Sequence, residues 1–97
     1  MVFVTTITSK ITFDPTKCEA NWQKHGISLT LAESIDWSEV WCAPDDRRDY
    51  RELREIGYAQ MDGQLYCVVF TQRGDMFRVI SLRRANSREV KRYVEQT

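Results

Sequence analysis

Three arginines in segments that predict β-strands could bind a phosphate group. Arg54 shares a strand face with Glu52, whereas strict alternation puts Arg78 and Arg83 on opposite faces unless a bulge intervenes. One of those two is therefore expected to be structural, paired with Glu52 or facing a partner, and we favour Arg83 for the site. A guanidinium group is costly to bury unpaired, so each is solvated, paired with a carboxylate or directed at a ligand. Ion pairs and a phosphate site both stay open as interpretations.

The single histidine of the sequence, His25, is the second chemical candidate. It follows Lys24 at the end of a predicted helix. One interpretation is structural: the ring stabilises the helix dipole or forms a hydrogen bond with Asn21, one turn earlier. The other is acid–base catalysis, because no other side chain in this sequence titrates near pH 7 without help from its surroundings.

Motifs of metal and cofactor enzymes are absent from the sequence. It contains no phosphate-binding glycine loop, no H-E-x-x-H, no G-x-S-x-G and no paired carboxylates at recognisable spacing. Cys18, Cys42 and Cys67 form no C-x-x-C pair, which is typical of reduced, mostly buried thiols. We therefore predict neither a metal nor a cofactor.

Length and composition predict one globular domain over 1–97. Hydrophobic residues make up 42% of the 97 and charged residues 29%, as in ordinary soluble proteins. No apolar run is long enough to cross a membrane, and the first residues lack a signal-peptide pattern. A cytoplasmic protein that does not contact membranes is expected, with residues 1–10 as an extension or an extra strand.

Charge is balanced over the whole chain but not along it. Residues 1–50 contain five basic and eight acidic residues (−3), and residues 51–97 contain nine basic and six acidic residues (+3). The basic residues concentrate toward the C-terminus, where a basic face would attract phosphate; the alternative is a solvated rim. They are Arg73, Arg78, Arg83, Arg84, Arg88, Lys91 and Arg92.

Capping residues, turn residues and apolar periodicity predict the elements that position these side chains. In the first half they are one or two strands within 2–13, a helix from Asp14-Pro15 to His25 ended by Gly26, a helix from the capping box Thr30-x-x-Glu33 to about Val40, and a charged loop over 43–50. In the second half they are strands over 52–61, 65–70 and 76–82, joined at Asp62-Gly63 and Arg73-Gly74-Asp75, and a helix from the capping box Asn86-x-x-Glu89. This order predicts an α+β fold: a three-stranded antiparallel meander plus an N-terminal strand, with a helical hairpin and a C-terminal helix.

Three signatures in order resemble the BrnT family, toxins of type II toxin–antitoxin systems with a RelE-like fold. The opening one reads Phe13-Asp14-Pro15-Thr16-Lys17, then Asn21 and Lys24-His25-Gly26; the middle one reads Asp49-Tyr50-Arg51-Glu52-Leu53-Arg54-Glu55-Ile56; the closing one runs through 68–75, 78–85, Glu89 and Tyr93. The resemblance covers nearly all of residues 11–94.

The resemblance implies a metal-independent endoribonuclease that cleaves messenger RNA and inhibits translation and growth. It also implies neutralisation by a BrnA-like ribbon-helix-helix antitoxin in a heterotetramer, in which the antitoxin binds operator DNA and the toxin does not read DNA. The alternative is an inactive homologue that acts as a binding or co-repressor protein.

RNA carries its own nucleophile, the 2′-hydroxyl, so cleavage needs alignment, charge stabilisation and proton transfer. We therefore expect Arg54, Arg78 and Arg83 to hold the scissile phosphate and Glu52 or His25 to accept the proton, with Tyr93 orienting the substrate or stacking on a base. Further contacts with RNA are expected from the remaining basic candidates. These are Lys24, Arg73, Arg84 and Arg88.

Overall fold

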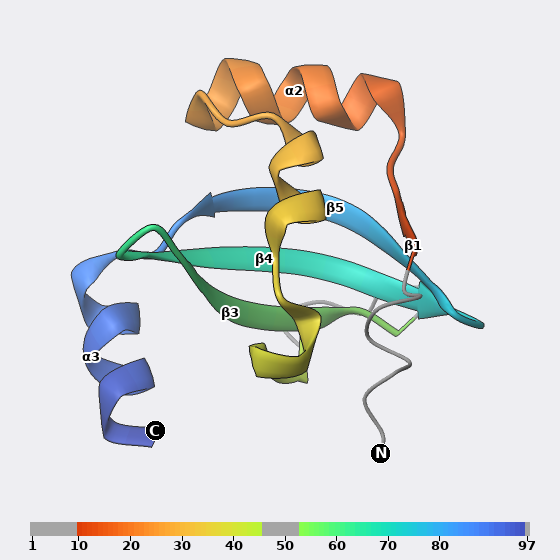
Figure 1. Cartoon of the computed structure of the whole chain (residues 1–97). Coiled ribbons are helices and arrows are strands. Elements are labelled where there is room, and N and C mark those ends of the chain that lie inside the picture. Colours follow the sequence, from red (N-terminus) through yellow and green to blue (C-terminus); the bar gives the residue numbers. More distant parts are fainter. Residues whose placement is uncertain (1–9, 46–52, 97) are drawn as a thin grey trace.

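The structure, a computed structural model, describes residues 10–45 and 53–96 and has a mixed α+β fold built on a five-stranded sheet (Figure 1). The strand order is β1-β5-β4-β3-β2. Neighbouring strands run antiparallel except β1 and β5, which are parallel. The strands are β1 (Lys10–Thr12), β2 (Trp41–Pro44), β3 (Glu55–Met61), β4 (Gln64–Arg73) and β5 (Met76–Arg84). The strand expected within 2–8 lies outside the described residues.

The central strand and its hairpin form as predicted. Residues 67–71 of β4 are all buried, because β4 is the middle strand and both of its faces are covered. Asp62 and Gly63 join β3 to β4, and both have positive φ angles, 51° and 77°. A two-residue type I′ turn requires this conformation at both positions.

The first helix, α2 (Pro15–His25), also has the predicted ends. The Asp14 side chain accepts a hydrogen bond from the Thr16 amide at 2.8 Å, and Gly26 closes the helix in the left-handed conformation. In Figure 1, α2 lies alongside β5 at one edge of the sheet. This placement brings the face that contains His25 near the last strand of the sheet.

The predicted second helix is wrong: the chain forms two short 3₁₀ segments there, η1 (Leu29–Ser34) and η2 (Trp37–Glu39). Leu29, Ala32 and Ile35 are buried and recur every three residues. That spacing matches the three residues per turn of a 3₁₀-helix, so one narrow face enters the core. Ile35 has an extended backbone and separates the two segments, so the expected helical hairpin does not form.

The start of the predicted charged loop over 43–50 is instead part of an edge strand. β2 pairs with β3, with Trp41 opposite Tyr58. Their rings are 5.8 Å apart, so aromatic contact supports a short strand that lacked a periodic pattern. Residues 46–50 of the predicted loop lie outside the described part of the chain.

The last helix, α3 (Ser87–Gln96), begins at the predicted capping box. The Asn86 amide donates to Glu89 Oε1 and the Glu89 amide donates to Asn86 Oδ1, both at 2.9 Å. No α3 residue is buried, and Val90 and Val94 are 39% and 65% exposed. The capping box therefore fixes the first turn of a helix whose other residues stay partly or largely exposed.

The hydrophobic core lies between one face of the sheet and the segments α2, η1 and η2. Trp37 packs against Phe70 and Phe77, with ring centroids 5.0 and 4.5 Å apart, so it is part of the core. In the described part of the chain, no helix is long and apolar enough to cross a membrane. The buried core residues are Leu29, Ala32, Ile35, Ala59, Val68, Phe70, Val79 and Leu82.

Candidate anion-binding site

A bulge in β5 puts Arg78 and Arg83 on the same face of the sheet. On β4, Val69 lies opposite Ser81 and its neighbour Phe70 lies opposite Val79, so Ile80 is an extra residue. Arg78 then pairs across to Thr71 and Arg83 to Cys67, which share a face of β4. The expectation of opposite faces from strict alternation is corrected, because one extra residue reverses the alternation beyond it.

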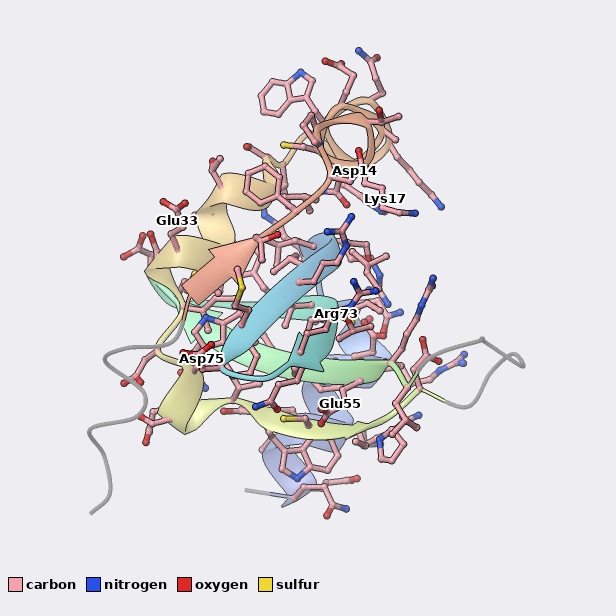
Figure 2. The ribbon with its side chains drawn as sticks, turned by 90° about the vertical axis from the view of Figure 1, so that its right-hand side faces the viewer. Asp14, Lys17, Glu33, Glu55, Arg73 and Asp75 are labelled. Atoms are coloured by element: carbon pink, nitrogen blue, oxygen red, sulfur yellow. The ribbon has the colours of Figure 1, made fainter. Side chains whose placement is uncertain are left out.

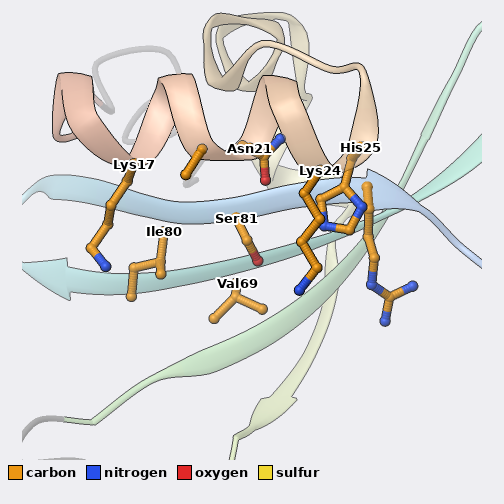
Figure 3. A pocket seen from close by; sticks show the side chains of 9 residues that line it. Lys17, Asn21, Lys24, His25, Val69, Ile80 and Ser81 are labelled. Carbon is orange, nitrogen blue, oxygen red and sulfur yellow. The ribbon is translucent and has the colours of Figure 1, made fainter.

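Between α2 and this face of the sheet lies a pocket of about 330 Å³ (Figure 3). The helix side is basic, and the sheet side combines apolar residues, a hydroxyl group and a guanidinium group. Figure 2 shows Lys17 on the side of α2 that faces the sheet, near Asp14 at the start of the helix. The residues that line the pocket are Lys17, Ala20, Asn21, Lys24, His25, Val69, Ile80, Ser81 and Arg83.

Asn21 anchors α2 to β5 at the back of the pocket. Its amide nitrogen donates to the carbonyls of Leu82 and Ile27, both at 2.8 Å, and its oxygen accepts from the Leu82 amide at 3.1 Å. β1 pairs with β5 only from Met76 to Arg78, so the side chain satisfies backbone groups that a longer β1 would have paired. The predicted alternative of a bond between Asn21 and His25 is not formed.

The helix side of the pocket presents three nitrogen-containing side chains that have no partner among the described residues. Lys17, Lys24 and His25 form no hydrogen bond or ion pair with any other described residue. Their spacing of seven and eight residues from Lys17 places them on one helix face. Unpaired cations around a concave, partly polar surface favour binding of an anion.

The surroundings of His25 favour the neutral form of its ring. Partial burial lowers its pKa below the ordinary 6.5, and the positive charges of Lys24 and Arg83 lower it further. A neutral imidazole has one nitrogen free to accept a proton. His25 can therefore act as a general base toward a hydroxyl group bound in the pocket.

Arg83 is held from the other side by a carboxylate. Its Nη1 and Nη2 donate to Oε1 and Oε2 of Glu89, both at 2.8 Å, and Tyr58 donates to Oε2 at 3.4 Å. The hydrogen bonds from Arg83 lower the pKa of Glu89 to about 2, and those to Glu89 raise the pKa of Arg83. Burial, with the nearby Cys67 and Glu89, raises the pKa of Tyr58 to about 12. The carboxylate partner of Arg83 is thus Glu89. The sequence suggested that one of Arg78 and Arg83 pairs with Glu52, which lies outside the described residues.

The forked ion pair leaves part of the Arg83 guanidinium open. Nη1 also donates to the backbone carbonyl of Arg84 at 3.2 Å. Within the described part of the chain, these contacts use three of the five guanidinium N–H groups. The other two, with an Arg83 side chain that is 30% exposed, are available to a ligand in the pocket.

Arg54 and Arg78 form a separate basic row on the same face. Arg78 lies opposite Thr71, and extending the β3–β4 register by one residue puts Arg54 on the other side of Thr71. Arg78 Nη2 is 3.9 Å from Asp14 Oδ2, a long and weak ion pair. Four residue pairs separate this row from Arg83, about 13 Å along the strand. The backbone positions of the three arginines are therefore spread along this face of the sheet, and only Arg83 lines the pocket.

The other predicted contacts are spread over the surface. Arg73, Arg84 and Arg88 are exposed and do not line the pocket. Tyr93 lines two other cavities on the α3 side, one of them with Asp36. Of the predicted site residues that the structure describes, Lys24, His25 and Arg83 therefore meet around this pocket.

Sequence reasoning missed three residues of this arrangement. Lys17 had a usable signal, because it precedes Lys24 by seven residues on the same helix face. Asn21 and Glu89 had none for these roles, since their partners depend on how α2 and α3 meet β5. Among the described residues, no three His, Cys, Asp or Glu side chains are grouped closely enough to hold a metal ion.

Comparison with known protein families finds one that this chain matches. A family model described as the ribonuclease toxin BrnT of type II toxin–antitoxin systems matches residues 13–89, more than half of the chain. The match includes all of the residues that line the pocket. No curated protein matches the sequence.

Proposed function

We propose that this chain, which belongs to the BrnT family of ribonuclease toxins of type II toxin–antitoxin systems, cleaves messenger RNA in the pocket between α2 and β5. The observation that carries the proposal is the pairing of a neutral His25 with the fixed guanidinium of Arg83 on the wall of one pocket. A base and a preorganised cation are the two groups that cleavage through the 2′-hydroxyl requires.

In the proposed reaction, His25 takes the proton from the 2′-hydroxyl as its oxygen forms a bond to phosphorus. The bond from phosphorus to the 5′ oxygen breaks, and that oxygen takes a proton from one of the two lysine ammonium groups. The products are a 2′,3′-cyclic phosphate and a 5′-hydroxyl end. Arg83 stabilises the charge that develops on the phosphate oxygens. Protein groups and the substrate supply each part of this step, so no metal ion enters it.

Arg54 and Arg78 have a different role in this proposal from the one that the sequence suggested. Their row lies about 13 Å from Arg83 along the sheet. They bind neighbouring phosphates of the same strand and so guide the RNA across the sheet face. The exposed Arg73, Arg84 and Arg88 contribute at most long-range attraction, and Tyr93 lies away from the reacting phosphate.

Membership of a type II toxin–antitoxin family implies an antitoxin partner. We propose that this partner is a BrnA-like ribbon-helix-helix protein in a complex with two copies of each chain, which acts in the cytoplasm. The antitoxin binds operator DNA in that complex, and the toxin does not read DNA itself.

Cleavage of a fluorescent RNA by the purified protein tests the proposal. With EDTA present, we expect the wild type to cleave the RNA and leave 2′,3′-cyclic phosphate ends, and an RNA with 2′-deoxy residues to stay intact. His25→Ala should lose cleavage, whereas Arg92→Ala, which removes an exposed charge of α3, should retain it.

The contrary outcomes separate the alternatives. RNA binding without cleavage by a folded wild type would favour the inactive binding protein. Loss of cleavage in Glu52→Gln with full activity in His25→Ala would move the general base to Glu52. Growth arrest on expression, reversed by the co-expressed antitoxin, is expected in the host cell.

A further inference from the structure

We propose that Glu89 is a positioning residue for this pocket: it fixes the Arg83 guanidinium at the site and makes catalysis depend on how α3 docks. The inference rests on the proposed ribonuclease function. Glu89 lies on a different element from every residue that lines the pocket. It contacts Arg83 and not the pocket, so its effect is transmitted through that side chain.

The geometry of the pair is that of a clamp. Both Nη atoms of Arg83 meet separate carboxylate oxygens at 2.8 Å, which fixes the plane of the guanidinium as well as its distance. The Glu89 side chain is only 14% exposed. An arginine side chain has many rotamers, so removing this partner would let the charge leave the pocket wall.

Glu89 is itself held by three kinds of contact. Besides Arg83, its oxygens accept from the Asn86 amide at 2.9 Å and from the Tyr58 hydroxyl at 3.4 Å. The Asn86 bond belongs to the capping box that begins α3, and Tyr58 lies on β3. The carboxylate thus joins the first turn of α3, the end of β5 and the centre of the sheet.

The helix that carries Glu89 has no residue that is fully buried. Val90 and Val94 are 39% and 65% exposed. The clamp at the first turn therefore contributes to the position of α3. Conversely, a shift of α3 would move Glu89 and with it the Arg83 guanidinium.

Loss of the contact between Glu89 and Arg83 should change one kinetic constant and leave the other nearly unaltered. Lys17 and Lys24 would still attract the RNA after the clamp is lost, so ground-state binding would change little. The charge stabilisation by Arg83 belongs to the transition state, so the loss should appear in kcat and not in KM. A purely structural role for Glu89 would lower stability without a selective loss of kcat in the folded protein.

The test compares Glu89→Gln with Glu95→Gln, which makes the same change at an exposed position on α3. For Glu89→Gln we expect kcat to fall by about 10- to 100-fold, since misplacement of a catalytic group by about 1 Å has an effect of this size. KM should stay within about twofold, and Glu95→Gln should match the wild type. In the double variant, Glu89→Gln should not lower kcat below the value of Arg83→Ala alone, because both changes remove the same function, charge stabilisation by Arg83.

Two further measurements keep the inference falsifiable. If Glu89→Gln does not fold, Glu89→Asp keeps the charge but shortens the side chain, and the same selective loss of kcat is expected. The NMR order parameter of the Arg83 Nε–H group should fall in the Glu89 variant, and this readout needs no cleavage. Three results would overturn the inference. They are a wild-type kcat in Glu89→Gln, a loss of kcat in the double variant that adds to that of Arg83→Ala, and an unchanged order parameter of Arg83 Nε–H. A wild type that cleaves no RNA would overturn the proposed function instead, and the order parameter would still decide the positioning role.

Discussion

At the scale of single residues, His25 acquires its chemistry from its neighbours. A histidine in the last turn of a helix is ordinarily stabilised in its charged form by the helix dipole. Here partial burial and the positive charges of Lys24 and Arg83 favour the neutral form. These surroundings oppose the effect of the helix dipole and keep the ring in the form that can accept a proton at pH 7.

The rate of RNA cleavage should depend on pH through His25. Because its folded pKa lies below 6.5, the neutral ring that accepts the proton persists at pH 7 to 8 and is lost as the pH falls through the folded pKa. The stability that the neutral ring contributes is present above the unfolded pKa and lost over the same acid range. We expect kcat to hold between pH 7 and 8 and to decline below about 6.5, and His25→Ala to lower kcat by about 10²- to 10⁴-fold.

The control for this prediction is the pH profile of Arg92→Ala, which should match that of the wild type. Kinetics of fluorescent RNA cleavage across the pH range supply the measurement. A rate that stays constant down to about pH 5 would contradict His25 as the base and point to a carboxylate, whose ordinary pKa is about 4.3.

At the scale of elements, one buried amide sets the position of α2 relative to the sheet. Asn21 is 5% exposed and satisfies both the N–H and the C=O of Leu82, directly beside the pocket residues Ser81 and Arg83. Lys17, Lys24 and His25 are on the same helix. The distance between the helix half and the sheet half of the pocket therefore depends on this side chain.

Asn21→Ala should destabilise the protein by about 2–4 kcal/mol, because it leaves buried backbone groups of Leu82 without a partner. At about 4–8 °C per kcal/mol, Tm should fall by more than roughly 8 °C. Gln23→Ala is the matched control and should change Tm little. Among the described residues, the Gln23 side chain bonds to the exposed Glu19 on the same helix and to no other. Circular dichroism during heating measures both, and a Tm for Asn21→Ala within about 2 °C of the wild type would contradict the anchoring role.

Close packing between β3 and the segment after η2 leaves no room for a side chain at Gly57. A Cβ atom there would lie 2.6 Å from Val40 Cγ1 and 3.2 Å from Val68 Cγ1. Gly57→Ala should therefore lower the free energy of unfolding by about 1–3 kcal/mol. Urea titration followed by fluorescence is the measurement. In a Val40→Ala background the loss should shrink, because the nearest atom is gone; an equal loss in both backgrounds would count against a clash with Val40.

At the scale of the whole molecule, cationic side chains gather at the pocket although the chain has no net charge. The 14 basic and 14 acidic residues cancel, so attraction to RNA must be local. Two of the pocket cations, Lys17 and Lys24, come from the acidic first half of the chain and Arg83 from the basic second half. The charge imbalance between the two halves of the sequence therefore predicted only part of this basic surface.

Binding of RNA should weaken with salt to the extent that the pocket and the adjoining row contact phosphates. With about four contacts, the slope of log K against log salt concentration should be about −3 for a single strand, equivalent to roughly 50-fold between 50 and 200 mM. Lys17→Ala with Lys24→Ala should make the slope shallower by about 1.4. Fluorescence anisotropy with a 2′-O-methyl RNA, which lacks the nucleophile, measures this.

The matched control is Lys91→Ala with Arg92→Ala, which removes two exposed charges from α3 and should leave the slope within about 0.5 of the wild type. A larger change in this pair than in the lysine pair of α2 would place the RNA on α3 instead of in the pocket.

Local signals in the sequence were sufficient for both ends of α2, the start of α3, the β3–β4 turn, the central strand and the family. Asp14 and Gly26 act through the nearest backbone groups, and Asp62-Gly63 acts through its own φ angles. Such effects extend over a few residues, so the sequence already contains all of their partners. His25, Lys24 and Arg83 could be chosen as candidates for the same reason: their chemistry belongs to the residue type.

Only the tertiary structure decided which candidates meet. One extra residue, Ile80, reverses the alternation of β5 and brings Arg78 to the face of Arg83, and its position depends on pairing with β4. Glu89 reaches Arg83 across the junction of a strand and a helix, where neither helical nor strand spacing applies. Leu29, Ala32 and Ile35 form a buried 3₁₀ face against the core, although the capping box favoured an α-helix. In each case the outcome depends on contacts between elements, and a pattern confined to one element does not contain them.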